Sequence, residues 1–90
     1  MDDQQIKNAV VFTMLRKKVI GGKKHQVKTV AGWAVPSHEE GRAKDLIDEL
    51  VQAGVVERYG GGHRANIRLS SPEQAVEYLK DNDGDVPFGW

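Results

Sequence analysis

The stretch DLIDELVQAGVVERYGGGHRANIRL, residues 45–69, decides the fold. In its first part, and just before it, apolar side chains recur every three or four positions, which places them on one face of a helix. These side chains are Ala43, Leu46, Ile47, Leu50 and Val51. Gly54 follows where a helix can end in the left-handed conformation. The stretch therefore predicts an amphipathic helix that ends beside Gly54.

The second part of the same stretch predicts a β-hairpin. Residues 55–59 and 65–69 favour strands, and the glycines at 60–62 between them supply a turn. Alternation along the second strand points Ala65, Ile67 and Leu69 inward, and leaves Asn66 and Arg68 outward. A lone two-stranded hairpin is only marginally stable in water, so we expect it to pack on the helices.

Two more helices are expected before this stretch. Asp2 or Asp3 can cap a helix whose apolar stripe runs from Ile6 to Leu15, and Gly21 and Gly22 end the segment. A brief strand at 23–27 leads into a short helix at 28–34, which Pro36 stops.

Ser37 and Glu40 stand at the spacing of a capping box, which predicts that Ser37 caps the third helix. The residues after the hairpin predict a fourth helix, with Ser71 and Pro72 at its start and Ala75, Val76 and Leu79 on its inner face.

Composition favours one domain, residues 1–85, followed by an aromatic tail at 86–90. The sequence has no Cys, which excludes disulfides and thiolate metal sites. No apolar run approaches a membrane span, and the acidic N-terminus is unlike a signal peptide. We therefore expect a cytoplasmic protein with no membrane contact. Phe88 and Trp90 in the tail either fold back or form a partner-binding patch, and we favour folding back.

The formal net charge of zero conceals an asymmetry. Residues 1–34 carry seven basic and two acidic side chains, whereas residues 35–90 carry six basic and eleven acidic ones. A basic half on a neutral chain favours a local contact surface for a polyanion, although Lys-rich loops are also common as plain solvated surface.

With these elements in order, residues 27–69 resemble a winged helix-turn-helix domain of prokaryotic and archaeal regulators. The resemblance rests on Leu46, Leu50 and Gly54, followed by the entry Val55-Val56-Glu57-Arg58 into the hairpin. It implies an α+β fold with a three-helix core, a β-hairpin wing and an additional C-terminal helix. It also implies binding of duplex DNA, as a transcriptional regulator or as a replication or plasmid accessory factor.

In that family the third helix enters the major groove. The candidate contacts from this helix are Ser37, His38 and Arg42, and Arg42 has the geometry to donate two hydrogen bonds to a guanine. The alternative for Arg42 is an ion pair with Glu39 or Asp45. Acids at the start of this helix would repel phosphates.

The hairpin and the first loop supply the other candidate contacts. The hairpin cations are Arg58, His63, Arg64 and Arg68, grouped around the glycine tip. The other candidates are Lys23 and Lys24 before the second helix and Lys28 at its start, which would attract phosphates without reading sequence. Trp33 follows helical spacing and is interpreted as core, whereas Tyr59 is compatible with either role.

Enzyme chemistry is not expected. His25, His38 and His63 fall in separate elements without metal-ligand spacing, and no phosphate-binding loop follows a strand, so no cofactor or metal is predicted. The alternative function is a protein-interaction module or homodimer that uses the acidic third helix or the aromatic tail. DNA binding is favoured if Lys24, Lys28, Arg42, Arg64 and Arg68 share one face. A protein partner is favoured if that face is dominated by exposed apolar groups and by Glu39, Asp45 and Glu49.

Overall fold

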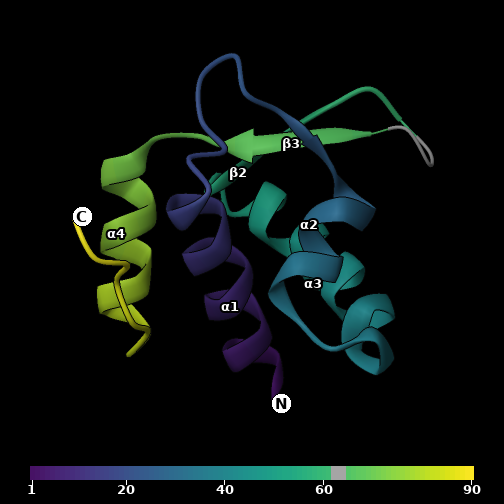
Figure 1. Ribbon diagram of the computed structural model, residues 1–90, viewed down its shortest axis with the longest axis horizontal. Coiled ribbons are helices and arrows are strands. Elements are labelled where there is room, and N and C mark those ends of the chain that lie inside the picture. Colours follow the sequence, from purple (N-terminus) through teal and green to yellow (C-terminus); the bar gives the residue numbers. More distant parts are fainter. Residues whose placement is uncertain (62–64) are drawn as a thin grey trace.

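A computed structural model describes residues 1–61 and 65–90 (Figure 1). Its elements are α1 Asp3–Arg16, β1 His25–Gln26, α2 Val27–Ala34, the 3₁₀ turn η1 Ser37–Glu39, α3 Glu40–Gln52, β2 Val56–Tyr59, β3 Asn66–Leu69 and α4 Pro72–Asp81. The described residues therefore form an α+β fold with four α-helices and a small antiparallel sheet, which confirms the predicted fold class at that level.

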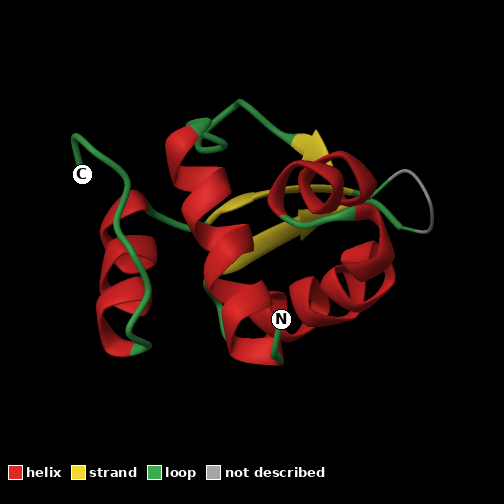
Figure 2. Cartoon of the chain, turned by 60° about the horizontal axis from the view of Figure 1, so that its bottom comes forward, coloured by secondary structure: helices red, strands yellow, loops and turns green. Residues whose placement is uncertain are grey.

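Helices α1, α2 and α3 pack against one another, and α4 lies beside α1 on the side away from α2 and α3 (Figures 1 and 2). The three strands follow the spatial order β1-β3-β2. His25 of β1 pairs with Ile67 of β3, and Tyr59 of β2 pairs with Asn66. The short first strand thus attaches the segment between α1 and α2 to the edge of the hairpin.

A single apolar cluster fills the space between the helices and the sheet. The predicted stripes supply it: the largest fully buried side chains include Ile6, Met14, Leu46, Leu50 and Leu79. The predicted alternation in β3 is also confirmed, because Ala65, Ile67 and Leu69 are at most 1% exposed. Burial of this apolar surface is the main force that holds the hairpin on the helices.

Helix ends follow the sequence at three places. The Asp2 carboxylate accepts from the Gln5 N–H and caps α1, and Ser71 caps α4 in the same way. Gly54 has φ +80°, and the Val55 N–H donates to the Leu50 carbonyl at 3.1 Å. This arrangement satisfies the last carbonyls of α3, as predicted.

The predicted capping box of the third helix is wrong. The chain leaves Pro36 in a tight 3₁₀ turn, in which the Glu39 N–H donates to the Pro36 carbonyl at 2.9 Å. Helix α3 therefore begins at Glu40, and its N-cap Glu39 makes no side-chain capping bond. Backbone groups that Ser37 would have satisfied are satisfied within the turn instead.

Trp33 is not a core residue, which corrects the interpretation from helical spacing. Helix α2 buries Val30 and Ala31, whereas Trp33 in its last turn is 39% exposed. In the tail, Pro87 is buried but Phe88 is fully exposed. The chain thus returns to the domain at Pro87 and turns Phe88 back into solvent. Among the described residues, no helix has both the length and the apolar character needed to cross a bilayer.

Candidate nucleic-acid interface

The loop after α1 meets the sheet at the end of the molecule away from the N-terminus (Figure 1). We call this loop, with the start of α2 and the adjoining strand β3, the basic end; the described cations of these segments are Lys17, Lys18, Lys23, Lys24, Lys28 and Arg68. The first strand explains why segments far apart in sequence meet here. Pairing of β1 with β3 brings residues 17–28 next to the hairpin, and the Val27 N–H donates to the Ala65 carbonyl at 3.3 Å.

The outward face of the sheet carries a bonded group of side chains. Arg68 donates from Nε to Glu57 Oε1 at 2.9 Å and from Nη1 to the Gly21 carbonyl at 2.7 Å. The Tyr59 hydroxyl donates to the same carboxylate at 2.8 Å. Lys24 Nζ lies 4.0 Å from the centre of the Tyr59 ring. Arg68 therefore faces outward, as its alternation predicts, but its guanidinium is already engaged by Glu57 and Gly21.

These bonds favour the ionised form of Glu57. The hydrogen bond from Tyr59, and then that from Arg68, holds the pKa of the Glu57 carboxyl below its ordinary value. The same carboxylate raises the pKa of the Tyr59 hydroxyl and of the Arg68 guanidinium. Glu57 thus offsets one positive charge of the basic end over the pH range where carboxylates are ionised.

A second ring lies on the same end. Lys17 Nζ lies 4.3 Å from the centre of the Trp33 ring, and the His25 ring meets that indole edge-on with its centre 4.9 Å away. Lys23 Nζ donates to the Lys17 carbonyl at 3.0 Å, which ties the two arms of the loop together. His25 pairs with the inward-facing Ile67, whereas Lys24 lies over Tyr59 on the outward face of the sheet, so the Trp33 and Tyr59 groups flank the first strand on different sides.

Arg42 of α3 is engaged elsewhere. Its guanidinium makes two hydrogen bonds to the Asp3 carboxylate of α1, one of them from Nε to Oδ1 at 3.0 Å, and it lies 3.9 Å from Asp45. The hydrogen bond from Arg42 lowers the pKa of Asp3, and that of Arg42 is raised in return. The sequence suggested an ion pair with Glu39 or Asp45, but the principal partner is Asp3 because this side of α3 faces α1.

The exposed surface of α3 is acid-rich. Asp45, Asp48 and Glu49 are all exposed. Arg58, predicted as a wing cation, pairs with Asp48 at 2.6 Å, and Lys7 of α1 pairs with Glu49 at 2.9 Å. The cations nearest α3 thus hold it to its neighbours and leave carboxylates facing solvent.

The predicted contacts therefore separate into two groups. Lys23, Lys24, Lys28 and Arg68 lie at the basic end, whereas His38, Arg42 and Arg58 lie among the acids of α3 and α1. Ser37 is exposed in the turn before α3. His63 and Arg64 are outside the described residues. Sequence reasoning missed Lys17 and the exposed Trp33; the run of basic residues at 16–18 was the available signal for Lys17.

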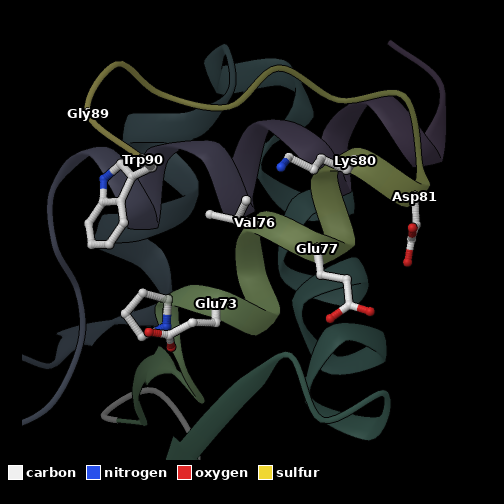
Figure 3. Close-up of a pocket in the computed structure, with 8 residues that line it drawn as sticks. Glu73, Val76, Glu77, Lys80, Asp81, Gly89 and Trp90 are labelled. Carbon is white, nitrogen blue, oxygen red and sulfur yellow. The ribbon is translucent and has the colours of Figure 1, made fainter.

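A groove opens between α4 and the returning tail (Figure 3). Its apolar lining comes from Pro72, Val76 and Trp90, and its rim carries Glu73, Glu77, Lys80 and Asp81. Trp90 is 41% exposed at the groove. This surface is acidic and apolar, in contrast to the basic end.

Among the described residues, no three His, Asp or Glu side chains come together in a way that could hold a metal ion. The chain matches no protein-family model, no curated protein and no solved structure.

Proposed function

We propose that the chain is a winged helix-turn-helix module that binds duplex DNA through its basic end, without catalysing a reaction. The order of α1, α2 and α3 followed by a hairpin supports the fold proposal, because it is the order that the sequence resemblance implies. The observation that carries the functional proposal is the basic end itself. Its six described cations include Lys17 over the Trp33 ring, and Lys24 and Arg68 over the Tyr59 ring.

The contacts are made mainly with phosphates in this proposal. Lysine ammonium groups on flexible stems suit phosphate oxygens, whose negative charge is the same for every base sequence. Helix α3 is poorly suited to lead into the major groove, since Asp45 and Asp48 on its exposed surface would face the phosphates. We therefore infer a binding mode with little sequence preference and a strong dependence on salt.

A role in transcriptional regulation, or in replication or plasmid maintenance, and a cytoplasmic location are part of this proposal. The test is a gel-shift titration with duplex DNA of random sequence at two salt concentrations. Binding at low salt that weakens steeply at the higher concentration is the expected result. The absence of a shifted band at low salt would overturn the proposal.

A protein-interaction module is the second candidate, and the groove beside α4 is the observation that favours it. Phe88 is fully exposed two residues from Trp90. Three carboxylates and one lysine on the groove rim favour a partner segment with an apolar side chain flanked by Lys or Arg. A second copy docked groove to groove would bring the carboxylates together, so self-association by this route is disfavoured.

Selection from a random peptide library tests this second candidate. We expect the selected peptides to be basic and to contain one large apolar residue. These peptides should not bind the Trp90→Ala variant and should still bind the Lys24→Gln variant. The groove would not be the docking site if the selected peptides lacked basic residues, or if they bound the Trp90→Ala variant as well as the original chain.

A further inference from the structure

Trp33 has more accessible surface than the other rings described at the basic end. Its exposed fraction is 39%, whereas His25 and Tyr59 are partly buried. An indole is a large apolar surface, and a free domain gains nothing from leaving it in water. Contacts with this ring include a T-shaped pair with the His25 ring and the ammonium of Lys17 at 4.3 Å.

Tyr59 has the same kind of contact but is held more firmly. Lys24 lies over its ring at 4.0 Å, and the Arg68 guanidinium carbon lies 5.1 Å from the ring centre. The Tyr59 hydroxyl and Arg68 share the Glu57 carboxylate, and Arg68 is also bonded to Gly21. A ligand that stacked on Tyr59 would have to break this group apart, whereas a ligand on the face of Trp33 that Lys17 covers has that side chain to displace.

A nucleobase that replaces Lys17 on the Trp33 ring should gain more affinity than the loss of the lysine contact costs. An exposed cation over an aromatic ring corresponds to roughly a two- to fivefold preference. A base stacked on an aromatic side chain contributes about five- to 150-fold to affinity. The Lys17 ammonium that leaves the ring can then bind a phosphate of the same nucleotide, which offsets the loss of its contact with Trp33.

We propose that Trp33 stacks an unpaired nucleobase, so that the basic end prefers duplex DNA with a single-stranded extension to blunt duplex. The base must be unpaired, because bases within a duplex already stack on their neighbours and present only their edges. This inference rests on the proposed function, in which the lysines of the basic end hold the adjoining phosphates.

The test uses the whole chain carrying Trp90→Phe, which leaves Trp33 as its one tryptophan. Tryptophan fluorescence and anisotropy are followed with a blunt duplex and with the same duplex extended by single-stranded thymidines. We expect the extension to raise the affinity at least about fivefold and to quench the fluorescence. Trp33→Leu should remove the gain that the extension gives, and Trp33→Phe should restore part of it.

Failure of this inference is distinguishable from failure of the proposed function. Binding of blunt duplex with neither a gain nor quenching from the extension would overturn the role of Trp33 and leave the phosphate contacts standing. A gain that survives Trp33→Leu would overturn it as well, because stacking would then occur elsewhere. No binding of either DNA would overturn both.

Discussion

Replacing Lys24 and Lys28 with glutamine removes two cations from the basic end without altering the core. Both side chains are exposed, Lys24 beside Tyr59 and Lys28 in the first turn of α2. If each touches one phosphate in the complex, its loss lowers the slope of log affinity against log salt by about 0.9. The pair should therefore lower the slope by about 1.8 units.

The number of lysines at the basic end gives the salt slope expected for the unmodified chain. Because Arg68 is paired with Glu57, the proposed function leaves the five described lysines of the basic end as the expected phosphate ligands. Five contacts give a slope of about 4.5, so a roughly fourfold rise in salt should weaken binding of the unmodified chain by about 500-fold. For the double variant the same rise should weaken binding by only about 40-fold.

Fluorescence anisotropy with a labelled duplex across a salt series measures both slopes. The matched control is Lys44→Gln with Lys80→Gln, which removes the same charge from exposed positions on α3 and α4. We expect the control to keep nearly the original slope. Parallel lines for the original chain and Lys24→Gln/Lys28→Gln would refute the phosphate contacts. An equal loss in the control would show that attraction follows net charge and not the basic end.

Three further outcomes are expected. Glu57→Gln should raise the salt slope by about 0.9, because Arg68 becomes available to a phosphate, and an unchanged slope in the same titration would mean that Arg68 stays on the sheet. Leu50→Ala should lower the free energy of unfolding by about 2–5 kcal/mol in urea, because Leu50 is 1% exposed, and an unchanged midpoint would contradict its place in the core. Asp3→Asn should reduce the loss of stability between neutral and acid pH. The pKa of Asp3 is lowered in the folded chain, so its contribution is full above the ordinary Asp value and is lost as pH falls through the lowered one. Arg42→Gln should have the same effect in urea unfolding at the two pH values, and an unaltered pH dependence in both variants would remove the Asp3–Arg42 pair as its source.

The elements and the core could be predicted because both depend on local periodicity. Leu46, Ile47 and Leu50 share a helix face whatever lies opposite, and only burial of that face gives a stable arrangement. Ile67 and Leu69 are fixed by alternation in the same way. These rules identify the side of an element that faces inward, and they need no knowledge of the partner.

The partners of surface charges could not be predicted by such rules. Asp3 lies 39 positions before Arg42, and no spacing rule connects them. Sequence reasoning considered only the acids on the same helix as Arg42. Trp33 is a second residue that such rules misplace, because its spacing of three from the buried Val30 predicts that it also faces the core. It lies instead in the last turn of an eight-residue helix, next to His25 and Lys17 and away from the core.

The ion pairs of α3 explain how a neutral chain can present a basic surface. Arg42, Lys7 and Arg58 are each paired with a carboxylate, at Asp3, Glu49 and Asp48 respectively. Cations that hold α3 to α1 and β2 are therefore offset where they stand, whereas the lysines of residues 17–28 have no comparable run of acids beside them in the sequence. This separation of charge should orient the molecule near a polyanion so that the basic end, and not α3, faces the negative charges. In a winged helix with this charge distribution, attraction to DNA would come from the first loop and the wing, and the third helix would contribute mainly to the core.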